Sequence, residues 1–113
     1  MAIIYHNNKC SKSRKGLEYL QEKTQTIEIK EYMKYGITKD EIIEIISKLH
    51  CSVHDIIRTN EPEYKELIKG KQISDDTLIE LIIQHPKLLQ RPIVINKNNA
   101  VIARPQEAID TII

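Results

Sequence analysis

A short apolar segment that runs into a helix-like segment most constrains the fold of this chain. Residues 2–5 have the apolar character of a β-strand, and the stretch after Cys10 carries Leu17 and Leu20 at helical spacing. A second strand is expected at residues 26–30. A strand, a helix and a second strand in this order predict two parallel strands joined by a right-handed crossover.

Capping residues and apolar residues at helical spacing predict four helices in the middle of the chain. Their first residues or caps are expected at Thr38, Ser52, Glu61 and Ser74. The second of these helices is short and ends near Arg58. The fourth must stop before Pro86, because the residue before a proline is disfavoured in a helix.

Strands return near the end of the chain, at residues 92–95 and 100–102, with a turn over residues 96–99 that predicts an antiparallel hairpin. Pro105 fits the first position of a last helix. The order βαβ, several helices, ββα predicts an α/β, thioredoxin-like fold: a four-stranded mixed sheet flanked by helices, with a helical insertion. A chain of 113 residues is expected to form one domain, residues 1–113.

Composition excludes several classes of function. The net charge of +1 lacks the basic excess of a nucleic-acid-binding surface, and no apolar run approaches the length of a membrane span. The N-terminal residues do not resemble a secretory signal. We therefore expect a cytoplasmic protein, in a compartment where its two cysteines stay reduced. We also expect the protein to be a monomer.

Cys10 is a candidate nucleophile because it lies at the junction of the first strand and helix. Unpaired main-chain N–H groups and the positive end of the helix dipole meet there, and both favour the reactive thiolate. Lys9, Lys12 and Arg14 add positive charge, and Ser13 can offer a hydroxyl. The alternative is that Cys10 is a small buried apolar side chain, as many free cysteines are.

Three arginines lie at the edges of predicted elements, and as a set they suggest an oxyanion site. Arg91 precedes Pro92 at a strand entrance and is expected to border Cys10, with a peptide bond that could be cis. Arg104 follows the hairpin, and Arg58 ends a short helix. The guanidinium fork suits bidentate pairing with tetrahedral oxyanions. Each arginine alone could instead be a solvated surface charge.

With these motifs the sequence resembles the glutaredoxin-coupled arsenate reductases of the ArsC family, over nearly the whole chain. The matching segments are residues 4–7, 10–14, 57–61, 64–67, 85–86, 89–94 and 103–105. The resemblance implies that Cys10 is the nucleophile and that Arg58, Arg91 and Arg104 bind and polarise the oxyanion.

The same resemblance gives His6 and Ser13 a role in lowering the pKa of Cys10, with Arg14 and Pro92 as supporting residues. The chain departs from the best-known members in two ways. It is shorter at its C-terminus, and Asn8-Lys9 replaces the proline-containing step often found before the cysteine.

The resemblance also implies a mechanism: Cys10 attacks arsenate to form a covalent thiol–arsenate adduct. Ser13 cannot act as a resolving thiol, so an external thiol is required. Glutathione is implied as co-substrate, with glutaredoxin, or thioredoxin in its place, as partner and with no bound cofactor. Cys51 is the only internal candidate for a resolving thiol, and a packing role is the alternative.

Other functions are weighed against this one. A metal site at His50, Cys51 and His54 is not expected, because a cap at Ser52 separates the histidines. Spx-type transcriptional regulators, which bind RNA polymerase, share this fold and many use a Cys-x-x-Cys switch, but Ser13 replaces the second thiol. A thiol oxidoreductase of the same fold with another substrate is the third possibility.

Overall fold

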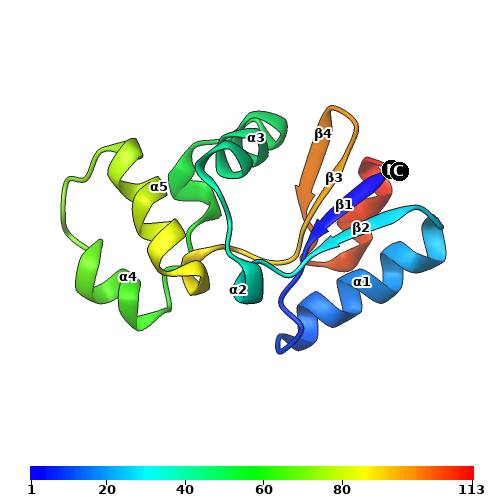
Figure 1. Cartoon of the computed structure of the whole chain (residues 1–113), viewed down its shortest axis with the longest axis horizontal. Coiled ribbons are helices and arrows are strands. Elements are labelled where there is room, and N and C mark those ends of the chain that lie inside the picture. Colours follow the sequence, from blue (N-terminus) through cyan, green and yellow to red (C-terminus); the bar gives the residue numbers. More distant parts are fainter. The chain divides into compact units, whose positions relative to one another are not determined.

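The computed structural model describes all 113 residues and divides into two compact units (Figure 1). Residues 1–35 and 91–113 form the first unit, and residues 36–90 form the second. The second unit is the helical insertion predicted between the two halves of the sheet. None of the helices combines the length and the apolar character that crossing a membrane requires. The assignment of residues 1–113 to one domain stays a prediction.

The first unit is built on a four-stranded mixed sheet with the order β2-β1-β3-β4. Strand β1 (Ala2–Tyr5) runs parallel to β2 (Ile27–Lys30) and antiparallel to β3 (Ile93–Asn96), which pairs with β4 (Asn99–Ile102). The predicted βαβ unit, hairpin and α/β class are confirmed, and the arrangement is the thioredoxin-like one.

Three helical segments belong to this unit. Helix α1 (Ser11–Lys23) follows Cys10, α2 (Tyr32–Tyr35) is a single turn after β2, and η3 (Gln106–Thr111) is a 3-10 helix. The prediction that Pro105 occupies the first helical position is wrong. Pro105 is the N-cap, with an extended ψ of 164°, so the helix begins one residue later.

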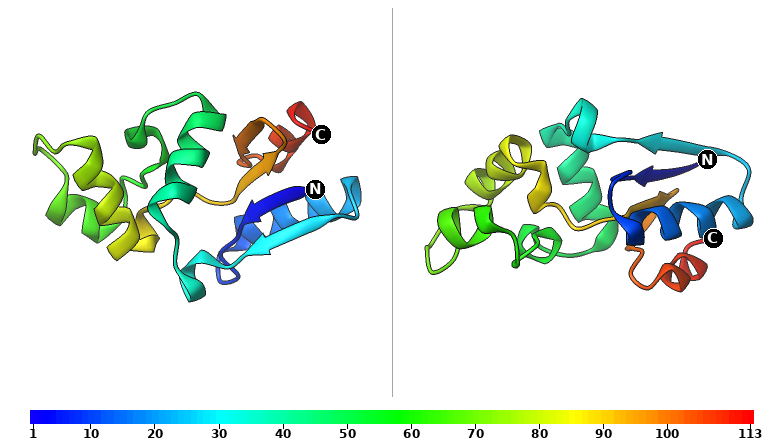
Figure 2. Two further views of the ribbon diagram at one scale, coloured as in Figure 1. Left: turned by 45° about the horizontal axis from the view of Figure 1, so that its top comes forward. Right: turned by 90° about the horizontal axis from the view of Figure 1, so that it is seen from below.

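The core of the first unit lies on the face of the sheet that α1 and η3 cover (Figure 2). Ile4 of β1 and Val94 of β3 are paired in register and fully buried. Leu20 of α1 and Ile109 of η3 pack against them with no exposed surface. Burial of each such side chain contributes about 1.5–3 kcal/mol, so the core fixes α1 and its N-terminus against the strands.

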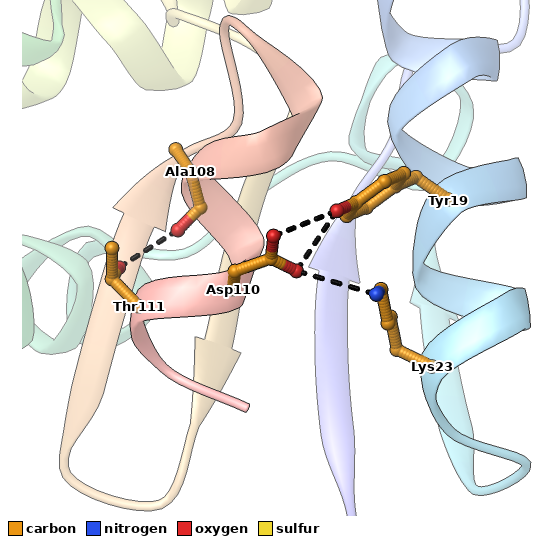
Figure 3. A network of polar contacts seen from close by, with 5 residues as sticks. All are labelled: Tyr19, Lys23, Ala108, Asp110 and Thr111. Carbon is orange, nitrogen blue, oxygen red and sulfur yellow. Dashed lines mark hydrogen bonds and ion pairs between the residues drawn. The ribbon is translucent and has the colours of Figure 1, made fainter.

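A polar contact at the surface also joins α1 to η3 (Figure 3). The Tyr19 hydroxyl donates to both carboxylate oxygens of Asp110, at 2.9 and 2.8 Å, and Lys23 Nζ lies 3.6 Å from the same carboxylate. The hydrogen bond to Asp110 raises the pKa of Tyr19 above its usual value. The C-terminal turn is thereby held to the helix that carries Cys10.

The second unit contains only helical elements and one isolated bridge. Its elements are α3 (Lys39–Leu49), η1 (Val53–Ile56), α4 (Pro62–Leu67), α5 (Asp75–Gln84) and η2 (Pro86–Leu88). The capping box of Thr38 and Glu41 is present as predicted. The helix expected to end near Arg58 is a 3-10 turn that ends at Ile56, because Ile57 extends to pair with Leu89.

Candidate functional site: one end of the sheet around Cys10

The register of the sheet brings three chain segments to the same end. Tyr5, the last residue of β1, pairs with Ile93, the first of β3, and Ile93 pairs with the last residue of β4. Beyond these pairs, the Ala103 N–H donates to the Pro92 carbonyl at 2.8 Å. The loop that carries Cys10, the Arg91–Pro92 step and the residues after β4 therefore all emerge at this end.

The loop after β1 is shaped by hydrogen bonds to Asn7. The Asn7 carbonyl accepts from the Cys10 N–H, and its side-chain Oδ1 accepts from the Lys9 N–H, both at 3.0 Å. Asn7 is almost fully buried, with 9% of its surface exposed. The loop thus turns tightly and presents Cys10 as the N-cap of α1, next to the first helical turn, whose N–H groups have no partner within the helix.

Ser13 and His6 form a buried polar pair beneath this loop. The Ser13 Oγ lies 2.8 Å from Nδ1 of His6 and accepts a hydrogen bond from the Asn7 N–H at 3.0 Å. Ser13 has no exposed surface and His6 has 3%. Burial lowers the pKa of His6 below its ordinary value, against smaller opposing effects of Asn8, Glu31 and the Ser13 contact. The imidazole is therefore neutral at neutral pH.

The thiol of Cys10 is partly exposed, and its pKa is lowered. Burial opposes ionisation, but four favourable interactions outweigh it. They come from the Ser13 N–H, from the Arg91 guanidinium both as a donor and as a positive charge, and from the Lys12 N–H. Donors that bind the anion favour the charged form. Cys10 is therefore more reactive near neutral pH than an ordinary cysteine.

Arg91 reaches Cys10 and keeps one donor unused. Its guanidinium lowers the pKa of the Cys10 thiol as a donor and as a positive charge, while its Nε is buried and has no partner. An unsatisfied buried donor costs about 1–3 kcal/mol, and an acceptor bound beside the thiolate would remove that cost. The arrangement is chemically an anion site with a nucleophile at its edge.

Pro92, the residue after Arg91, packs closely on the helix that carries Cys10. The Arg91–Pro92 peptide bond is cis, as predicted, and so is Arg104–Pro105. A Cβ at Gly16 would lie 2.6 Å from Cγ of Pro92, closer than real side chains approach. The glycine allows α1 to lie directly against this step.

Two other predicted site residues belong to the first unit. The Arg14 guanidinium donates to the Asn8 carbonyl at 2.9 Å, which holds the loop before Cys10. Arg104 follows Ala103 at the same end of the sheet and is exposed, and its guanidinium makes no hydrogen bond or ion pair within the first unit. Its proposed contact with an oxyanion stays a prediction.

Arg58 and Cys51 lie in the second unit. Arg58 Nε is 3.8 Å from a carboxylate oxygen of Glu61, and its main-chain N–H donates to the Leu88 carbonyl. The role of Arg58 in binding the oxyanion stays a prediction from the family resemblance. Burial, followed by the charge of Asp55, raises the pKa of Cys51. Cys51 is therefore a weaker nucleophile than an ordinary cysteine, which favours the packing role.

Sequence reasoning missed Asn7 as a functional residue. Its three hydrogen bonds, through the N–H, the carbonyl and the side chain, connect the end of β1 to the loop and to α1. The available signal was an asparagine two residues after the end of a strand, since asparagine often bonds the main chain two residues on. No group of three or more His, Cys, Asp or Glu side chains is placed to hold a metal ion.

A thioredoxin-like fold whose first helix begins at a cysteine of lowered pKa beside an arginine is typical of proteins that act through a thiol. Comparison with known sequences and structures agrees. The sequence model of the ArsC family matches residues 5–112, and the chain belongs to this family, which includes arsenate reductases.

Named relatives cover most of the chain. It is 35% identical to an arsenate reductase of Escherichia coli K12 over 107 residues, 94% of this chain and 76% of the relative. It is also 35% identical to an arsenate reductase of Neisseria meningitidis serogroup B, over 97% of this chain and 96% of the relative. The solved structure of an arsenate reductase from Vibrio cholerae matches with a TM-score of 0.93 and 36% identity, covering 99% and 97% of the two chains.

Proposed function

We propose that this protein is an arsenate reductase in which the Cys10 thiolate attacks arsenate. The observation that carries the proposal is the pairing of Cys10 with Arg91. One donor of the guanidinium stabilises the thiolate, while the buried Nε–H has no acceptor. A tetrahedral oxyanion bound beside the sulfur would accept that hydrogen bond. Relatives that are named arsenate reductases support this choice of oxyanion.

Positive charge is needed because both reactants are anions. Arsenate is a dianion near neutral pH, and each pair of unit charges about 4 Å apart repels by about 4 kcal/mol at an effective dielectric near 20. The Arg91 guanidinium and the N–H groups of Ser13 and Lys12 offset this repulsion at the sulfur. Donors fixed before the reaction also stabilise charge that develops on the arsenic oxygens.

The first step forms a bond between the Cys10 sulfur and arsenic, with loss of water or hydroxide, and gives a covalent adduct. Reduction of As(V) to As(III) then takes two electrons. Ser13 occupies the position where a Cys-x-x-Cys protein has its second thiol, and the pKa of Cys51 is raised by burial. We therefore assign the second thiol to an external reductant, glutathione, with glutaredoxin or thioredoxin clearing the mixed disulfide. The reaction is placed in the cytoplasm, where such thiols stay reduced.

The test is arsenate-dependent oxidation of NADPH with glutathione, glutaredoxin and glutathione reductase present. Wild type is compared with Cys10→Ser and with the matched variant Cys51→Ser. We expect turnover in wild type and Cys51→Ser and only background in Cys10→Ser. If wild type gives no turnover with this couple or with thioredoxin, the proposal is wrong, and a thiol oxidoreductase with another substrate takes its place.

A further inference from the structure

The residues around Cys10 form the most basic segment of the chain. Residues 9–15 contain Lys9, Lys12, Arg14 and Lys15, all exposed, and no acidic residue. The whole chain has 17 basic and 16 acidic residues, which leaves 13 basic against 16 acidic residues outside this segment. Positive charge is therefore concentrated at the nucleophile of an otherwise acidic chain.

Three of these four cations have no partner within the first unit. Arg14 is used to hold the loop through a main-chain carbonyl. Lys9, Lys12 and Lys15 form no ion pair with a carboxylate of this unit, whereas Lys23, on the same helix, pairs with a carboxylate of η3. We call Lys9, Lys12 and Lys15 the basic rim.

The basic rim flanks the sulfur on both sides along the chain. Lys9 directly precedes Cys10, and the main-chain N–H of Lys12 is one of the donors that lower the pKa of the thiol. Lys15 lies three residues after Lys12 in α1, so the two residues are neighbours on the helix surface, with Cβ atoms about 5–6 Å apart. Their ammonium groups are compact charges on flexible stems, and they can meet a ligand that approaches Cys10 from solvent.

In the proposed function, the buried Nε–H of Arg91 binds the oxyanion. The basic rim is therefore available to bind the second reactant, the thiol that reduces the Cys10 adduct. We propose that the basic rim binds the carboxylates of a low-molecular-weight thiol and so selects an anionic thiol as the reductant of the Cys10 adduct. The rim spans one loop residue and the first two turns of one helix, which matches a peptide-sized ligand. The inference deepens the proposed function and rests on it for the identity of the adduct.

The step that the rim assists is attack of the external thiolate on the Cys10 sulfur of the adduct. A sulfur–sulfur bond forms, and the sulfur–arsenic bond breaks with its electron pair going to arsenic. Arsenic is reduced from As(V) to As(III) and leaves as arsenite after protonation by water, while the two sulfurs become a disulfide. A thiol of glutaredoxin or thioredoxin then attacks this mixed disulfide and releases Cys10.

The first experiment measures the charge preference at Cys10 without arsenate. In a Cys51→Ser background, the rate of alkylation by anionic iodoacetate is divided by the rate with neutral iodoacetamide. Both reagents need the thiolate, so the ratio cancels any change in its population. With all three rim lysines changed to glutamine, we expect the ratio to fall about tenfold at low salt. Changing them to arginine instead keeps the charge and should keep the ratio.

The second experiment identifies the ligand. Cys10 is converted to a mixed disulfide with thiopyridine, and release of thiopyridone is followed with glutathione or with its ethyl ester, which has one carboxylate fewer. We expect wild type and the arginine variant to prefer glutathione several-fold and the glutamine variant to lose this preference.

Either of two results would overturn the inference. One is an alkylation ratio that is the same in the glutamine and arginine variants, and the other is equal rates with glutathione and its ester in wild type. Neither experiment uses arsenate, so a failure of the arsenate reductase proposal would show in turnover assays and leave these two readouts unchanged.

Discussion

The Ser13 hydroxyl lies 2.8 Å from Nδ1 of His6, and both side chains are buried. His6 directly follows β1 and Ser13 belongs to the first turn of α1, so the contact joins the elements on either side of Cys10. Because the hydroxyl oxygen also accepts the Asn7 N–H, its own proton is free to be donated to the neutral imidazole. One hydroxyl thus satisfies two buried polar groups.

Replacing Ser13 with alanine removes this hydroxyl and leaves the Asn7 N–H and the His6 nitrogen without their partner. Loss of a hydrogen-bond partner costs about 1–3 kcal/mol for each buried group left unsatisfied. We expect Ser13→Ala to lower the free energy of unfolding by at least about 1 kcal/mol, measured by urea denaturation followed by circular dichroism. Ser11→Ala, an exposed position in the same helical turn, is the control and should be close to neutral. Equal stability of the two variants would contradict the assigned role.

Local signals were sufficient to predict much of the fold. The short apolar run of residues 2–5 gave β1, and the Thr38 and Glu41 capping box gave the start of α3, because both depend on neighbours within a few residues. The short helix α2 and the 3-10 form of η1 were not predicted. Ile57 is held extended by Leu89, which is distant in sequence, and no local pattern records that pairing.

The candidate site was also predicted only in part, because some of its geometry depends on contacts between residues that are distant in sequence. The proximity of Arg91 to Cys10 followed from the expected topology, since antiparallel β1 and β3 place the end of one beside the start of the other. The unpaired Nε of Arg91 and the hydrogen bonds of Asn7 depend on how the main chain turns back on itself. Such geometry arises from the assembled unit and leaves only a weak trace in the sequence.

Asn7 provides a test of that main-chain geometry. In Asn7→Ala, the Lys9 N–H loses its acceptor, and the loop that sets the sulfur against the N–H groups of α1 is less constrained. We expect the pKa of Cys10 to rise, seen as a shift to higher pH in the rate of iodoacetamide alkylation. Asn98→Ala, exposed in the turn between β3 and β4, is the matched control. A pKa as low as that of wild type would show that the loop holds its shape without this side chain.

Arg91 can be tested by separating its charge from its shape. Lysine keeps the positive charge but loses the planar fork with its several donors. Arg91→Lys should therefore retain part of the lowered pKa of Cys10, which Arg91→Ala should lose, because charge and hydrogen bonding both contribute. Arsenate turnover should fall about 10²–10³-fold in both variants, as expected for loss of a donor that stabilises the transition state. Full turnover in Arg91→Lys would exclude a need for the fork.

The pH dependence of stability gives a test of buried His6. Burial lowers the pKa of His6 in the folded state from its ordinary value of 6.5, so between these two values the unfolded chain binds the proton and the folded chain does not. The free energy of unfolding should therefore decrease as the pH falls through about 6.5 toward the lowered pKa, and His6 should contribute no pH dependence well above it. Urea denaturation of wild type and His6→Asn across this range isolates the contribution, since the other titrating groups are shared. On acidification, wild type should lose stability relative to His6→Asn, so the difference between their free energies of unfolding should change in favour of the variant. A difference that is constant with pH would mean that His6 is protonated equally in both states and that burial does not control it.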